Sequence, residues 1–269
     1  GIYNNFMNKN NLTPAATILL FKNSEAGPKV FMVKRSKKPP FENLYVFPGG
    51  KVDQDDGSGK MYAFCKGLND EKASSQLNMG SGGLAYWVAA IRESFEEVGI
   101  LMAELSDKQL GAGDSYNKKL KDYRDSINNG ELTFYEMLAS EGLDLSLDNI
   151  SPLSHWITPE IEKRRFNTRF FVAEIPNFQT GEHDGRETTD SVWITPEDAL
   201  KKAESGDMQM IMPTTKNLES CCGFNSVEEL INTKKNIKPT DRPPILPKFF
   251  KKNGNWVGLL PEDEGYEQA

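Results

Sequence analysis

One stretch, residues 84–100 (LAYWVAAIRESFEEVGI), limits what this chain can fold into more than any other. On a helix of 3.6 residues per turn, its three glutamates fall on one face and an apolar stripe gathers on the opposite face. The glutamates are Glu93, Glu96 and Glu97, and the stripe consists of Leu84, Val88, Ile91, Phe95 and Val98. Like charges at this spacing destabilise a helix by about 0.2–0.5 kcal/mol per pair, and Arg92 lies one turn before Glu96. We therefore expect a positive partner on the acidic face; a plain solvated stripe is the simpler alternative.

Composition restricts the class of protein. With 269 residues the chain fits one large domain, or one domain with appendages, and a net charge of −7 is unlike that of a general nucleic-acid binder. No apolar run approaches the roughly 20 residues that span a bilayer, and no secretory signal is evident. The cysteines are Cys65, Cys221 and Cys222, an odd number without C-x-x-C spacing. We expect no nucleic-acid or membrane partner and a cytoplasmic location.

The first half of the chain combines strands with insertions. Residues 1–13 are polar and predict a flexible tail. Residues 15–21 and 29–34 read as strands that form a hairpin around Gly27-Pro28. The segment LYVFPGGKV, residues 44–52, reads as a strand that feeds a tight turn at Gly49-Gly50. Insertions are expected at about 57–83, with a short helix near residues 62–68, and at about 102–150, where the spacing predicts helices over 115–128 and 133–141.

The second half returns to strands and then helices. A sheet region is predicted to begin at His155, and further strands are predicted over residues 164–173 and 190–194. Helices are predicted over residues 196–205, 214–220 and 226–233. Residues 238–247 (KPTDRPPILP) should be extended. This order indicates an α/β protein with an α/β/α layered domain over residues 14–225 and a mixed sheet. Residues 226–269 would then form a C-terminal helix and an extended Pro-rich arm.

The turn and the acidic helix together resemble the Nudix box, G-x5-E-x7-R-E-U-x-E-E-x-G-U, in which U is apolar. The second half matches over residues 92–100, apart from Ser94 at an apolar position. Counted from Gly50, the first glutamate position holds Asp56, and the arginine expected at position 64 stands at position 92. The box is therefore interrupted by 28 residues, which need not move either of its ends.

Other segments narrow the resemblance to the coenzyme A diphosphatase-like branch of the Nudix hydrolases. These segments are Phe47–Gly50, Val52-Asp53 with Asp56, Trp156–Pro159, Arg164–Phe171 and Leu259–Pro261. The resemblance covers about residues 14–264. It implies a Nudix-type α/β/α sandwich with a mixed sheet and helical insertions.

The same resemblance implies a divalent metal site. Glu93, Glu96 and Glu97, with the Gly50 carbonyl, would hold Mg2+ or Mn2+, because hard cations take oxygen ligands. Arg92 would orient these carboxylates, and Glu96 and Arg92 are counted among the catalytic residues. Asp56 is interpreted as structural.

The general base is expected in a loop outside the box. Glu187, within residues 182–190 (EHDGRETTD), is the candidate, and Glu182, Asp184 and Asp190 are rivals. A solvated loop acid is an equally good explanation of Glu187. The two histidines, His155 and His183, offer no metal cluster and are interpreted as packed and exposed, respectively.

Arginines on the strand over residues 164–173 are candidates for the substrate site. Strand alternation places Arg165 and Arg169 on one face and Arg164 on the other. Guanidinium groups suit phosphate, and Arg35, followed by Lys37 and Lys38, could add to them. Pairing with the many carboxylates of the chain is the alternative.

The function implied by the resemblance is metal-dependent hydrolysis of a nucleoside diphosphate-linked small molecule. The favoured substrate is coenzyme A or acyl-CoA, which would give 3′,5′-ADP and (acyl-)phosphopantetheine. The alternatives are an ADP-ribose or dinucleotide pyrophosphatase and a non-catalytic Nudix ligand-binding module. A homodimer is a further expectation.

Overall fold

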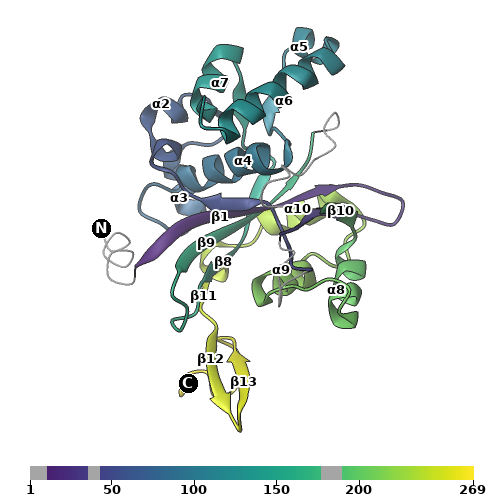
Figure 1. Cartoon of the computed structure of the whole chain (residues 1–269). Helices are drawn as coiled ribbons and strands as arrows, with labels where there is room; N and C mark the ends of the chain where they lie inside the picture. The colour runs from purple at the N-terminus through teal and green to yellow at the C-terminus, as the bar shows by residue number, and fades with distance from the viewer. Residues whose placement is uncertain (1–10, 36–42, 177–189) are drawn as a thin grey trace.

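A mixed eight-stranded sheet forms the centre of the molecule (Figure 1). The structure is a computed structural model that describes residues 11–35, 43–176 and 190–269. The strands follow the order β10-β2-β1-β9-β8-β11, while β3 pairs with β2 and β4 pairs with β1. Their bounds are β1 (Leu12–Lys22), β2 (Lys29–Lys34), β3 (Tyr45–Val46), β4 (Gly49–Lys51), β8 (Ile150–Ile157), β9 (Arg165–Glu174), β10 (Asp190–Ile194) and β11 (Pro244–Ile245).

Strand β1 organises this sheet. It pairs in parallel with β9 over ten residues and in antiparallel fashion with both β2 and β4. Gly27, at a φ of 103°, lies in the connection between β1 and β2, and the predicted hairpin is confirmed. Strand β1 begins at Leu12, three residues before the expected start, because its first residues pair with β9.

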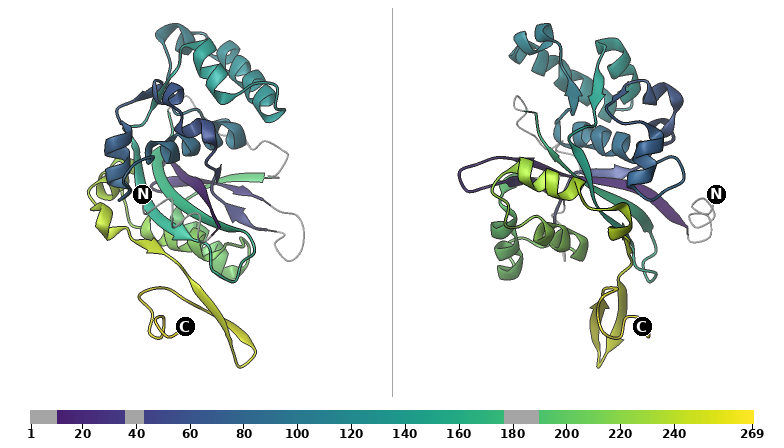
Figure 2. Two further views of the ribbon diagram at one scale, coloured as in Figure 1. Left: turned by 90° about the vertical axis from the view of Figure 1, so that its left-hand side faces the viewer. Right: turned by 180° about the vertical axis from the view of Figure 1, so that it is seen from behind.

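Helices cover both faces of the sheet (Figures 1 and 2), as predicted for an α/β/α domain. One face carries α2 (Gly59–Tyr62), α3 (Asp70–Gln76), α4 (Leu84–Val98), α5 (Asp107–Gly111), α6 (Asp114–Asn128) and α7 (Phe134–Glu141). The other carries α8 (Pro196–Ser205), α9 (Met212–Ser220) and α10 (Val227–Lys235). Short 3-10 helices are also present, η1 (Gln54–Gly57) and η2 (Pro239–Asp241). A small second sheet consists of β5 (Cys65–Lys66), β6 (Ala103–Glu104) and β7 (Asp144–Ser146).

The helix α4 spans the residues that the sequence predicts, and its apolar stripe is buried. Ile91, Phe95 and Val98 are at most 1% exposed, and burying such side chains stabilises the fold by roughly 1.5–3 kcal/mol each. Trp87 is also fully buried, where its indole N–H donates to the Ile150 carbonyl at 3.1 Å. Gly99 ends the helix at a φ of 75°, and its N–H donates to the Phe95 carbonyl.

The two insertions hold the two ends of α4. Asp70 of α3 accepts hydrogen bonds from the backbone N–H groups of Leu84 and Gly82 at the start of the helix. Arg124 of α6 donates to the carbonyls of Glu96 and Glu97 at 3.0 and 2.7 Å. An anion at the N-terminus and a cation at the C-terminus are the arrangement that the helix dipole favours. Both insertions therefore help to position the acidic helix.

Three local expectations differ from the structure. Gly49 and Gly50 belong to strand β4 and pair with Thr17 and Ala16, so this segment is not a tight turn. In the first insertion the helices are α2 and α3, not one helix near residues 62–68. After the proline-rich segment, β12 (Lys248–Lys252) and β13 (Asn255–Leu259) form a hairpin that projects from the body of the molecule (Figures 1 and 2).

No helix within the described ranges has both the length and the apolar character needed to cross a membrane.

Candidate active site

Strand β4 and helix α4 meet although 32 residues of the chain, residues 52–83, lie between them. The N–H of Gly49 donates to Oε2 of Glu97 at 3.0 Å. A Cβ added to Gly50 would lie 2.5 Å from the carboxyl carbon of Glu93, so a larger residue here would displace this carboxylate from its position. The two glycines therefore bring backbone groups of β4 against the acidic face of α4.

Arg92 is the centre of the acidic cluster. Its guanidinium bonds Asp56 twice, at 2.9 and 3.1 Å, and reaches Glu93 at 3.1 Å and Glu96 at 2.9 Å. It also donates to the Lys51 carbonyl, and Asp53 lies within 3.3 Å. A bidentate contact of this kind fixes both partners. The positive partner expected on the acidic face is thus Arg92 itself, which holds the carboxylates in place.

Asp56 connects the two halves of the cluster. It is 1% exposed and accepts a hydrogen bond from the Asp53 N–H at 2.8 Å within the η1 turn. Burial raises the pKa of Asp56, while Arg92 opposes this shift. The contacts of Asp56 are with Arg92 and its own turn, which agrees with a structural role.

The cluster has an excess of negative charge. Four carboxylates, those of Asp53, Asp56, Glu93 and Glu96, contact the one guanidinium of Arg92, and a fifth, that of Glu97, accepts from the Gly49 N–H on the same side of α4. Burial raises the pKa of Glu96 to about 7, and the charge of Glu93 adds to this effect. Burial also raises the pKa of Glu93. An additional cation would lower the electrostatic energy of this cluster.

Comparison with known proteins identifies the family. Residues 67–220, more than half of the chain, match the family described as the NUDT19 Nudix domain. The chain belongs to this Nudix family. The acidic helix lies within the matched residues, and the insertion that separates it from strand β4 carries η1, α2, β5 and α3.

Relatives and solved structures agree with this assignment. The acyl-coenzyme A diphosphatase NUDT19 of Xenopus laevis is 27% identical over 241 residues, which cover 78% of this chain and 63% of the relative. The protein of the same name from Gallus gallus is 23% identical over 277 residues, covering 89% and 72%. A NUDIX hydrolase from Alicyclobacillus acidocaldarius has the same fold, with a TM-score of 0.61, 21% identity and coverage of 82% of this chain and 96% of that structure.

The donor set of the Nudix box fits a hard divalent cation. In the described part of the chain, no three acidic, histidine or cysteine side chains are already arranged as a metal site. Glu93 and Glu96 instead contact Arg92, and Glu97 contacts Gly49. The three carboxylates nevertheless share one side of α4 with the backbone of Gly50, and oxygen donors of this kind suit Mg2+ or Mn2+. The excess negative charge is the structural observation that favours such an ion.

The candidate bases lie mostly outside the described residues. Glu187, Glu182 and Asp184 fall in residues 177–189, which the structure does not describe, as does His183. Asp190, the remaining rival, begins β10, is exposed and pairs with Lys34 of β2. Glu187 therefore stays a prediction.

The candidate substrate arginines lie on different surfaces. Arg165 and Arg169 share the α4 face of β9, as alternation predicts, whereas Arg164 lies just before the strand begins. Arg169 is 4% exposed and donates to the Leu77 carbonyl at 2.8 Å, whereas Arg165 donates to the Thr158 carbonyl. Arg164 is exposed beside the Phe166 ring, and Arg35 follows β2, where its N–H donates to the Leu44 carbonyl. Lys37 and Lys38 lie outside the described residues.

Sequence reasoning missed the residues that support α4 from the insertions. Asp70, Arg124 and Asn128 hydrogen-bond to the ends of the helix, and Asn128 reaches the Glu96 carbonyl at 2.9 Å. Asp70 precedes its partner Leu84 by 14 residues, and Arg124 follows its partners Glu96 and Glu97 by 28 and 27 residues. Contacts over such distances in the sequence leave no local pattern. His155 is buried against Asn167 and its pKa is lowered to about 3 by burial, so the prediction that it is packed is confirmed.

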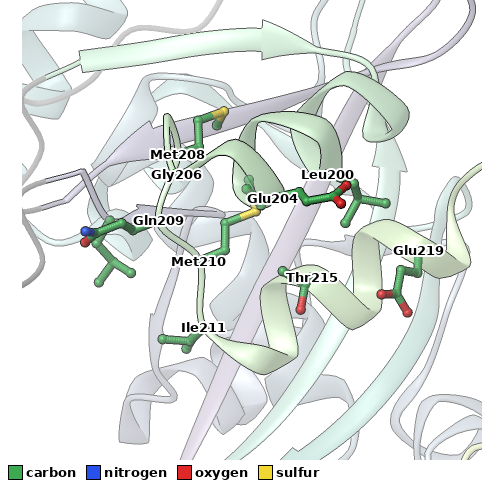
Figure 3. Close-up of a pocket in the computed structure, with 11 residues that line it drawn as sticks. Leu200, Glu204, Gly206, Met208, Gln209, Met210, Ile211, Thr215 and Glu219 are labelled. Atoms are coloured by element: carbon green, nitrogen blue, oxygen red, sulfur yellow. The ribbon is translucent and has the colours of Figure 1, made fainter.

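A separate cavity of about 730 Å3 lies between α8 and α9 (Figure 3). Leucine and methionine side chains line it, and Glu204 and Glu219 lie at its wall. The cavity lies on the face of the sheet opposite α4 (Figure 1), where Met208 and Leu218 join the second core cluster. It lacks the clustered carboxylates that the Nudix box places on α4.

Proposed function

We propose that this chain catalyses metal-dependent hydrolysis of a nucleoside diphosphate-linked small molecule. The favoured substrate is coenzyme A or acyl-CoA, and the products are 3′,5′-ADP and (acyl-)phosphopantetheine. The main support for the proposal is that Gly50 lies against Glu93 and that the Gly49 N–H donates to Glu97. These contacts bring the two separated parts of the box together around carboxylates that suit a divalent cation. The similarity to the acyl-coenzyme A diphosphatases of Xenopus laevis and Gallus gallus supports the substrate class.

Each residue of the box has a proposed role. Glu93, Glu96, Glu97 and the Gly50 carbonyl hold Mg2+ or Mn2+, which would neutralise the diphosphate and make a bound water more acidic. Arg92 keeps the carboxylates in position through the contacts described above. Asp56 anchors Arg92 from the other half of the box.

The bond changes are those of a hydrolysis. The oxygen of water forms a bond to one phosphorus of the diphosphate, and the bond between that phosphorus and the bridging oxygen breaks. Glu187 accepts the proton of the attacking water, and the leaving phosphate departs with the electron pair of the broken bond. No covalent intermediate with the protein is required.

The substrate is proposed to meet arginines outside the box. Arg35, Arg164, Arg165 and Arg169 are the proposed contacts for its phosphates, since guanidinium groups bind phosphate through paired N–H donors. Arg165 and Arg169 have the better position, because they lie on the same sheet face as α4. Arg164 is exposed just before β9 begins, and it would act only if the substrate reaches this end of the strand.

A substrate screen tests the proposal. Coenzyme A, an acyl-CoA, ADP-ribose, NADH and diadenosine polyphosphates are incubated with the protein and Mg2+ or Mn2+, and the products are identified by mass spectrometry. Formation of 3′,5′-ADP from coenzyme A is the expected result. Turnover of ADP-ribose with inert coenzyme A would replace the favoured substrate, and binding without any turnover would indicate a ligand-binding module.

A single substitution tests the metal assignment. Glu97→Gln keeps the shape of the side chain and removes its charge, so we expect turnover to fall by about 100-fold or more while the protein remains folded. Circular dichroism and a binding titration with Mn2+ separate loss of folding from loss of the ion. Near-normal turnover of this variant would reject the assignment.

We also propose a cytoplasmic homodimer. The three cysteines are free, which agrees with a reducing compartment. The C-terminal hairpin projects from the body and exposes 60% of Trp256, an arrangement suited to contact with a second copy. Neither a nucleic acid nor a membrane is proposed as a partner.

A further inference from the structure

A second cluster of positive charge lies beside β8 and β9, apart from the Arg92 cluster. Arg169 and Arg242 line the same small pocket, together with Gln76 and His155. Arg242 also lines the adjoining cavity of about 440 Å3, which Lys235 borders. The two arginines are 73 positions apart, and β9 and the segment after η2 bring them together.

Both arginines donate hydrogen bonds to backbone carbonyls. Arg169 donates to the Leu77 carbonyl at 2.8 Å, and Arg242 donates to the carbonyls of Gln76 at 3.3 Å and Ile237 at 3.0 Å. The buried Nε of Arg242 has no hydrogen-bond partner among the described residues. Within those residues, no carboxylate lies at ion-pair distance from Arg242. Arg242 therefore has donor capacity that the described fold leaves unused.

The local field is positive. Burial lowers the pKa of Arg242, and the neighbouring charge of Arg169 lowers it further. Burial and then the charge of Arg169 lower the pKa of His155 to about 3, so this histidine is neutral near pH 7 and adds no charge to the site. One acid, Asp148, borders the 440 Å3 cavity, and its backbone carbonyl accepts a hydrogen bond from Lys235. Like charges brought together out of water favour an anion between or beside them.

We infer that the cavity bordered by Arg242 and Lys235, with Arg169 behind it, is a binding site for a phosphate group. The guanidinium of Arg242 supplies a buried donor, Lys235 supplies an exposed ammonium at the border of the cavity, and Arg169 supplies a further positive charge. This site is separate from the metal-binding carboxylates and needs no divalent ion.

The position of the site allows two sources of the phosphate. Across the sheet, Gly50 pairs with Ala16, Ala16 with Arg169, and Arg169 with His155. The backbones of Gly50 and Arg169 are thus two strand spacings apart, about 10 Å. Either a second, non-reacting phosphate of the substrate or a free phosphate compound can therefore fill the site.

A thermal-unfolding titration with inorganic phosphate in EDTA tests the site itself. Phosphate also stabilises proteins by exclusion from their surface, so the comparison is between variants. We expect a saturable rise of Tm in the native protein and in the control Lys252→Met, a substitution on the remote hairpin. Arg242→Met should retain only the linear, non-saturable rise, and Arg242→Lys should show weaker saturation. Equal saturation in Arg242→Met and the native protein would overturn the site, and so would its absence from the native protein.

A kinetic comparison separates the two sources and rests on the proposed function. Coenzyme A carries a 3′-phosphate that dephospho-coenzyme A lacks. If this group fills the site, Arg242→Met should raise KM for coenzyme A by about tenfold and leave KM for dephospho-coenzyme A unchanged. Unchanged values for both substrates, together with loss of saturable phosphate binding, would support a free phosphate compound. Absence of all turnover would count against the proposed function, while the thermal titration would still decide the site.

Discussion

At the scale of single residues, Arg92 determines the geometry of the Nudix box. It contacts the carboxylates of both halves, Asp56 from the first half and Glu93 and Glu96 from the second. Its side chain is 8% exposed, so these charges interact with little screening by water. Removing it would leave the buried Asp56 and the partly buried Glu93 and Glu96 without this positive partner.

We predict that Arg92→Met lowers the free energy of unfolding by about 3–5 kcal/mol, because it leaves Asp56 buried without a counter-charge. Urea unfolding followed by circular dichroism measures this change. Lys118→Met is the control, since Lys118 and Asp122 form an exposed pair that should contribute less than about 1 kcal/mol. A similar loss in both variants would contradict the central position of Arg92.

The raised pKa of Glu96 should make the stability of the folded protein depend on pH. Its pKa in the folded protein, raised to about 7 by burial, lies above the ordinary value of 4.5. Between these values the folded state holds a proton that the unfolded state has lost, so the free energy of unfolding falls as the pH rises. In EDTA we expect Glu96→Gln to reduce this fall between pH 5 and 7.5 by about 1–3 kcal/mol. Urea unfolding at several pH values measures it, and identical slopes in both proteins would contradict the prediction.

At the scale of elements, the acidic helix depends on segments inserted in the chain. Asp70 from the first insertion bonds its N-terminus, and Arg124 from the second bonds its C-terminus. Both contacts follow the direction of the helix dipole. The insertions therefore stabilise the element that carries the proposed metal ligands.

We predict that Arg124→Met lowers kcat by about tenfold and changes KM little, because it releases the carbonyls of Glu96 and Glu97 and displaces their side chains. Steady-state kinetics with coenzyme A measures both constants. Lys121→Met, an exposed substitution on the same helix, is the control and should keep both constants. A change in KM alone would show that Arg124 acts on substrate binding.

At the scale of the whole molecule, the C-terminal hairpin stands apart from the sandwich. A two-stranded hairpin alone is only marginally stable in water, and β12–β13 is tied to the body through Leu260, which joins the second core cluster. The hairpin strands carry Lys248, Lys251 and Lys252 without any acidic residue, while the whole chain has a net charge of −7. This contrast favours contact between the hairpin and an acidic surface of a second copy.

We predict that Trp256→Ser weakens the proposed homodimer by about tenfold in Kd and leaves the stability of the monomer nearly unchanged, because this side chain is 60% exposed. Light scattering coupled to size-exclusion chromatography over a range of concentrations measures the association. Ile161→Ser, a change at a residue 56% exposed outside the hairpin, is the control. A native protein that stays monomeric at every concentration would refute the homodimer.

Local patterns were sufficient for many elements. The helix α4 and strands β2 and β10 have the predicted bounds, because hydrophobic periodicity and turn residues are properties of neighbouring residues. The hairpin β12–β13 was missed although Asn253-Gly254 is a strong hairpin signal; both residues have positive φ. The proline-rich segment before it suggested an extended chain instead.

The sequence by itself determined the acidic helix, its apolar anchor and the two halves of the Nudix box, since these depend on spacing within short segments. Tertiary structure alone decided that Gly49 and Gly50 form a strand against Glu97 and Glu93, that Arg124 supports α4, and that Arg169 lies beside Arg242. These contacts join residues that are 27 to 73 positions apart. Their formation depends on how the whole chain packs, because no local propensity selects one distant partner over another.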